Sequence, residues 1–167
     1  MDFIATARRQ MLAGELNDAR EKLLDSFAGL SDEEMVMPGV AGDWSIRDIL
    51  AHLAAWDRAT TEAFRAMLEG EHPDFIELDE EGIEIFNQEQ HSASLGGSVA
   101  EAVSSLISAR EELVELLRGV DNAKLFAPAP GDEHADLSIA ACIGVTADHD
   151  EEHAEMIETW RALRGQD

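Results

Sequence analysis

The sequence predicts an all-α protein, a four-helix bundle built as one domain over residues 1–167. Four long segments carry apolar residues with a period of 3.6, and nothing shows the period-two alternation of strands. Each segment has a capping residue at its start or a glycine at its end. The length of 167 residues and the apolar share of 45% suit a single sizeable core.

The first two helices are bounded by their caps. We expect the first from about Asp2 to Ala28, because Gly29 follows as a C′ residue. The second begins at Ser45, which forms a capping-box pattern with Asp48, and ends before Gly70. The apolar stripe expected to bury the first helix comprises Phe3, Ala7, Met11, Leu16, Leu23 and Phe27.

The last two helices follow the same rule. The third begins at Ser98, with Glu101 three residues later, and ends before Gly119. The fourth runs from Ser138 to Arg164 and stops at Gly165.

Three connections separate these helices. Residues 31–44 hold a short capped turn from Ser31 to Glu34, and residues 120–137 are too rich in proline and glycine for a long helix. Residues 70–97 are too long for a simple turn, so we expect a further helix in their middle, from Phe75 to His91.

The bulk composition limits the partners. A formal net charge of −24 would repel nucleic acid and anionic membrane. No apolar run approaches the roughly 20 residues needed to cross a bilayer, and the N-terminus lacks the pattern of a secretory signal. A cytoplasmic protein with a small-molecule partner is therefore expected. The single cysteine, Cys142, excludes an internal disulfide and is expected to be a buried, inert thiol.

Three histidines occupy inward positions. His149 and His153 lie four residues apart on the apolar stripe of the fourth helix, and His52 lies on the stripe of the second. Buried imidazoles need partners, and one divalent ion would satisfy all three. A pair that is only hydrogen-bonded or faces solvent is the alternative. The other histidines, His72, His91 and His134, are expected at the surface.

Three protein ligands would leave coordination positions open, which is the catalytic rather than the structural arrangement. Such a site would lower the pKa of a bound water or thiol and polarise a carbonyl. The run His149-Asp150-Glu151-Glu152-His153 is superficially similar to the His-Glu-x-x-His helix of zinc proteases. An aspartate in place of the catalytic glutamate, with no strands, argues against that class. Asp148, Glu151 and Glu152 are expected at the rim of the site or in solvent.

Two sequence segments resemble a known family. The run from Gly42 to Trp56 resembles the second-helix motif of the DinB/YfiT-like superfamily, and the run from Asp148 to Ala154 resembles its fourth-helix motif. The resemblance covers nearly the whole chain and implies an up-down-down-up bundle with a long crossover between helices two and three. It also implies a divalent metal, often nickel or zinc, at the positions of His52, His149 and His153.

The spacing of the motifs and Asn87 in the crossover resemble the branch that includes the colibactin self-protection and DfsB-like proteins, some of which work without a metal. Other relatives are mycothiol-dependent maleylpyruvate isomerase and S-transferases that use bacillithiol or similar low-molecular-weight thiols. The resemblance thus implies a metal-dependent transferase or hydrolase acting on a small electrophile, with a thiol cosubstrate as an option. The alternatives are a self-protection protein that binds a small molecule without turnover, and a structural bundle that forms a homodimer.

Four further residues are candidates for substrate binding. Trp44 and Trp56 flank His52 and would form either a core contact or an apolar wall of the pocket. Asn87 would donate to a substrate or cap a local turn. Arg110 lies on the third helix's stripe, where it would reach an inward carboxylate or, as we favour, extend its head to the surface.

Overall fold

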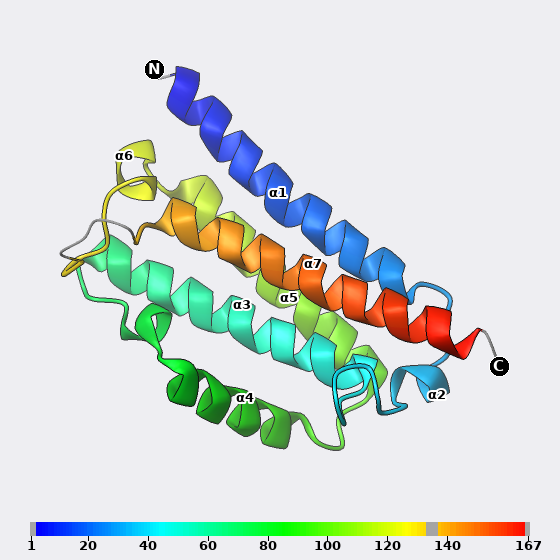
Figure 1. The fold of residues 1–167 in the computed structure, drawn as a ribbon. Coiled ribbons are helices and arrows are strands. Elements are labelled where there is room, and N and C mark those ends of the chain that lie inside the picture. The colour runs from blue at the N-terminus through cyan, green and yellow to red at the C-terminus, as the bar shows by residue number, and fades with distance from the viewer. Residues whose placement is uncertain (1–2, 133–136, 166–167) are drawn as a thin grey trace.

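The computed structural model describes residues 3–132 and 137–165, and these residues form a helical bundle without strands (Figure 1). The long helices are α1 (Phe3–Phe27), α3 (Ile46–Glu69), α5 (Val99–Gly119) and α7 (Ile139–Arg164). α1 packs beside α7, and α3 packs beside α5. In Figure 1, α1 and α7 run in one direction and α3 and α5 in the other. The bundle is therefore up-down-down-up, as expected.

Helix caps fix the boundaries of the bundle helices. The Ser45 side chain accepts from the backbone N–H of Asp48, whose carboxylate accepts in return from the Ser45 N–H at 2.9 Å. The helix ends at Gly70, whose φ of 88° is a left-handed conformation that glycine adopts without strain. The same capping box, Ser98 with Glu101, starts α5. The predicted starts of α3, α5 and α7 are confirmed, and α5 extends one residue further, through Gly119.

The crossover holds two helices where one was predicted. A 3₁₀ turn, η1 (Asp74–Glu77), precedes α4 (Glu80–Ser94), and α4 lies along α3 (Figure 1). The break occurs because Asp79 caps α4: its carboxylate accepts from the Gly82 N–H at 2.8 Å. The prediction of a continuous helix from residue 75 to 91 was therefore wrong at its start.

Two short helices complete the chain. α2 (Asp32–Met35) begins at the predicted capped turn, where Ser31 forms a capping box with Glu34. α6 (Asn122–Leu125) is a single turn within the connection predicted to lack a long helix. None of the helices in the described residues is long and apolar enough to span a membrane.

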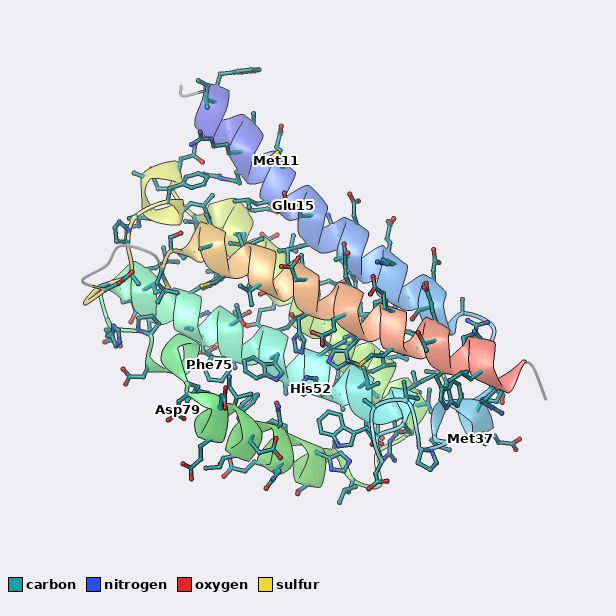
Figure 2. All side chains as sticks on the ribbon, viewed as in Figure 1. Met11, Glu15, Met37, His52, Phe75 and Asp79 are labelled. Atoms are coloured by element: carbon teal, nitrogen blue, oxygen red, sulfur yellow. The ribbon has the colours of Figure 1, made fainter. Side chains whose placement is uncertain are left out.

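The apolar core begins well inside α1. Leu16 and Leu23 are fully buried, but Phe3 is 84% exposed and Met11 is 61% exposed. Figure 1 shows why: the first turns of α1 extend past the other long helices, and Met11 points away from them in Figure 2. The prediction that Phe3, Ala7 and Met11 face the core was therefore wrong, because the periodic stripe continues beyond the part of α1 that the other long helices cover.

Candidate metal centre and adjoining cavity

His52 on α3 and His149 and His153 on α7 meet in the interior. Figure 2 shows His52 on α3, and its Nε2 lies 3.1 Å from Nε2 of His149, which lies 3.2 Å from Nε2 of His153. The three ring centroids are 4.9 to 5.2 Å apart. Among the described residues these three form a group whose ligand atoms all lie within 4.8 Å of one another.

This spacing fits one divalent ion. Metal–imidazole bonds of roughly 2.0–2.1 Å, at angles of about 90 to 110°, place two nitrogens about 2.8 to 3.4 Å apart. The observed separations of 3.1 and 3.2 Å fall in that range. His52 and His153 are buried and His149 is partly buried.

Burial keeps the three imidazole rings in the neutral form that metal binding requires. Desolvation, followed by the other two histidines, lowers the pKa of His52 to about 3. Desolvation and then His153 lower the pKa of His149 to about 4, and burial also lowers the pKa of His153. The three imidazoles are therefore neutral near pH 7, as metal ligands must be.

The three imidazole rings cannot satisfy all of one another's hydrogen-bonding groups. Nε2 of a neutral imidazole is either one donor or one acceptor, so Nε2 of His149 cannot form N–H···N bonds with Nε2 of both His52 and His153. Within the described part of the chain, Nδ1 of His52 and Nδ1 of His153 also lack a hydrogen-bond partner. Buried polar atoms without partners destabilise the fold, and an ion held through Nε2 would relieve the cost of the Nε2 atoms that the rings cannot pair with one another. The residues present thus fit a divalent metal.

Aromatic rings hold His52 from two sides. Trp44 meets its ring edge-on at 5.1 Å, and Trp56 lies 6.1 Å away. His91 stacks on Trp44 at 5.0 Å and keeps a partly exposed side chain. His72 is exposed, as expected, and His134 lies outside the described residues.

A cavity of about 600 Å³ adjoins the triad. His149 lines it, together with Trp56 of α3 and Phe75, which lies beside the start of α4 in Figure 2. The remaining lining residues are Asp57, Thr60, Leu78, Ile83, Leu137, Ala141, Cys142, Val145, Thr146, Asp148, Asp150 and Glu152. A largely apolar cavity of this volume suits a small organic molecule.

Cys142 lies in the wall of this cavity and is buried, as predicted. Burial raises the pKa of its thiol to about 11. The thiol therefore stays protonated near pH 7 and is a poor nucleophile there.

Asn87 binds a tryptophan. Its side-chain oxygen accepts the indole N–H of Trp56 at 2.9 Å, which ties α4 to α3. Neither role considered for Asn87, a substrate contact or a turn cap, includes this bond. Trp56 lines the cavity and also packs on Phe86 at 5.0 Å, so Asn87 and Phe86 together set the angle of one cavity wall.

Arg110 is buried in an ion-pair network. It is 4% exposed, and its Nε donates to Asp57 at 2.9 Å, so the favoured expectation of a surface-seeking head was wrong. Its Nη2 lies 3.0 Å from Asp150, and its Nη1 donates to the Leu16 carbonyl at 2.9 Å. Arg20 binds the same two carboxylates, Asp57 at 3.0 Å and Asp150 at 2.8 Å. The guanidinium of Arg110 is thus committed to protein partners.

This network links all four long helices next to the histidine triad. Arg20 lies on α1, Asp57 on α3, Arg110 on α5 and Asp150 on α7. Asp150 follows His149 directly in the sequence, so the network fixes the rotation of α7 that turns His149 inward. Arg20, Asp57 and Asp150 were missed by sequence reasoning, although each is a charge close to an apolar stripe.

The rim of the cavity is acidic. Asp148 and Glu152 are exposed and line it one turn apart on α7, whereas Glu151 lies 3.4 Å from Lys22 of α1. No lysine or arginine is among the described residues that line the cavity. Arg65 of α3, which does not line the cavity, pairs with Glu112 at 2.6 Å.

Comparison with known proteins identifies the family. The family model of the DinB superfamily matches residues 15–157. The structure resembles a solved structure named Sibling Lethal Factor Precursor - DfsB, with a TM-score of 0.79 and 16% identity over 93% of this chain and 96% of that one.

Two further solved structures share the fold. An uncharacterised protein from Escherichia coli UTI89 has a TM-score of 0.77 at 16% identity, with 94% of each chain covered. A protein from Streptococcus pneumoniae has a TM-score of 0.76 at 14% identity, covering 92% of this chain and 90% of that one. No curated protein matches. The family model spans most of the sequence, and the chain therefore belongs to the DinB superfamily.

Proposed function

We propose that this protein is a metal-dependent enzyme, a transferase or hydrolase that acts on a small electrophile. The observation that carries the proposal is the convergence of three neutral imidazoles, spaced for one ion, beside a largely apolar cavity of about 600 Å³. His52, His149 and His153 would hold nickel or zinc. The bound ion would supply a Lewis acid at the end of the cavity.

The chain's own residues bind and orient the substrate. Trp56 and Phe75 provide aromatic surface that would exclude water from the reacting group. His149 lines the cavity, so an ion held by the triad would face the substrate from the side of His149.

The attacking group would come from outside the chain. The Cys142 thiol is protonated near pH 7, and the carboxylates of Asp57 and Asp150 are engaged by two arginines. These are the buried thiol and carboxylate groups among the described residues that line the cavity. A water or a low-molecular-weight thiol as cosubstrate is therefore part of the proposal.

The proposal is tested by turnover of the metal-loaded protein. Protein loaded with nickel or zinc is mixed with epoxides, activated esters and Michael acceptors, each with and without a panel of cellular thiols. We expect a rate at least about tenfold above that of the His149→Gln variant, which keeps a polar side chain but loses one ligand.

Two results would oppose this expectation. Saturable binding of an electrophile with no turnover would support the self-protection alternative, in which the cavity captures its ligand. Equal rates for the native protein and the His149→Gln variant would show that the triad takes no part in the chemistry.

A further inference from the structure

The charges around the cavity indicate which kind of molecule it accepts. Asp57 and Asp150 are at its inner wall, but Arg20 and Arg110 neutralise them. Asp148 remains at the rim with Glu152, and both carboxylates are exposed.

Neither rim carboxylate is neutralised by the protein. Among the described residues, neither Asp148 nor Glu152 makes an ion pair or a side-chain hydrogen bond, whereas the neighbouring Glu151 and Glu155 lie 3.4 Å from Lys22. Asp148 and Glu152 are four residues apart on α7, so their side chains stand on one face of the helix, the face that borders the cavity.

The wall beside these carboxylates is apolar and aromatic. Val145, one turn before Asp148, is 70% exposed and lines the cavity. The rings of Trp56 and Phe75 line the same cavity, and their centroids lie 5.2 Å apart at an interplanar angle of 50°. Aromatic rings next to carboxylates attract a cation with an apolar body, because the ring quadrupole and the negative charge act in the same sense.

We propose that the cavity takes an apolar small molecule that carries a positive charge, with its apolar body against Trp56 and Phe75 and its cationic group at Asp148 and Glu152. This inference rests on the proposed function, since it takes the cavity as the substrate site. It also restricts the cosubstrate: a thiol that enters this cavity would carry little net negative charge.

The inference is tested with three matched probes. Each has a 4-phenylbutyl body, and the head is trimethylammonium, hydroxyl or sulfonate, groups that coordinate metals weakly. Binding to the metal-loaded protein is measured by calorimetry at low salt and again at 0.5 M salt. An exposed carboxylate adds a few-fold to the affinity for a cation, so we expect the cation to bind roughly three- to tenfold tighter than the alcohol. The sulfonate should bind most weakly, and high salt should reduce the differences to about twofold.

A double variant locates the effect. Asp148→Asn with Glu152→Gln should bring the three dissociation constants within about twofold of one another and leave that of the alcohol unchanged. The matched control is Asp18→Asn with Glu158→Gln, which removes the same charge from exposed helix positions that do not line the cavity. This control should keep the preference for the cation.

Four results would overturn the inference. The sulfonate could bind as tightly as the cation, or none of the probes could bind. The Asp148→Asn/Glu152→Gln protein could keep the cation preference, or the control protein could lose it, which would assign the preference to the net charge of the whole chain. Metal content is measured separately in every variant. A protein that binds no metal but still prefers the cation would sink the proposed enzyme and leave the ligand class intact.

Discussion

Replacing Arg110 by methionine would remove one cation from a buried cluster of four charges. In the native protein, Arg20 and Arg110 together offset Asp57 and Asp150, all of them at most 7% exposed. The variant would leave two carboxylates with one guanidinium, and it would leave the Leu16 carbonyl without its donor at 2.9 Å. A methionine fills much the same space, so the change in free energy comes mainly from the lost charge.

The expected loss is large. Removing one partner of a buried ion pair costs about 3 to 5 kcal/mol, because the remaining charge is left uncompensated. A domain of this size has a free energy of unfolding of about 5 to 15 kcal/mol. The Arg110→Met protein should therefore lose about a fifth or more of its free energy of unfolding, or unfold outright.

Urea denaturation followed by circular dichroism measures this loss. The control is Arg65→Met, which removes a guanidinium that is 40% exposed and pairs with the exposed acids Glu62 and Glu112. Its cost should stay below about 1 kcal/mol. In the double variant Arg110→Met/Asp150→Leu the charges balance again, so its cost should fall short of the sum of the single costs by about 1 to 3 kcal/mol. A loss below 1 kcal/mol for Arg110→Met, or strict additivity in the double variant, would refute the argument.

Three further predictions concern pH, thiol reactivity and helix capping. Burial lowers the pKa of His52 to about 3 and that of His149 to about 4. Below about pH 6.5 the unfolded metal-free chain therefore binds more protons than the folded one. The free energy of unfolding of the metal-free protein should fall by up to about 1.4 kcal/mol per pH unit for each ring as the pH drops toward 4. When the free energy of unfolding is measured by urea titration at several pH values, it should depend less steeply on pH in His52→Gln than in the native protein. An unchanged pH dependence would count against burial of a neutral ring. With its pKa raised to about 11, Cys142 should react with iodoacetamide at pH 7.5 about 100-fold more slowly than in the urea-unfolded chain, and near-equal rates would contradict its burial. Ser45→Ala should cost about 1 kcal/mol by removing the N-cap of α3, whereas no change in urea midpoint would show that Asp48 suffices alone.

The sequence predicted the features that depend on local pattern. The caps at Ser45 and Ser98 are short-range chemistry, so the starts of α3 and α5 could be read directly. Helical periodicity places His52, His149 and His153 on the inward-facing sides of their helices. This is why the convergence of the triad could be anticipated.

Features that depend on pairing between helices could not be read in the same way. Arg20 and Asp57 are charged, and nothing in either helix alone shows that the other would neutralise it. The signal that was available is joint: four charges of balanced sign lie near the inward stripes of four helices. The exposure of Phe3 and Met11 has a related cause, since an apolar period does not reveal how far the neighbouring helix extends.

The measurement that tests the central claim most directly is the metal stoichiometry of the stripped protein after equilibrium dialysis against nickel or zinc. The geometry of the triad predicts one ion per native chain and less than about a fifth of an ion in each of the variants His52→Ala, His149→Ala and His153→Ala. The matched control, His72→Ala, should bind one ion, since His72 is not in the triad. A native protein that binds no ion, or any triad variant that retains a full equivalent with unchanged affinity, would contradict the account.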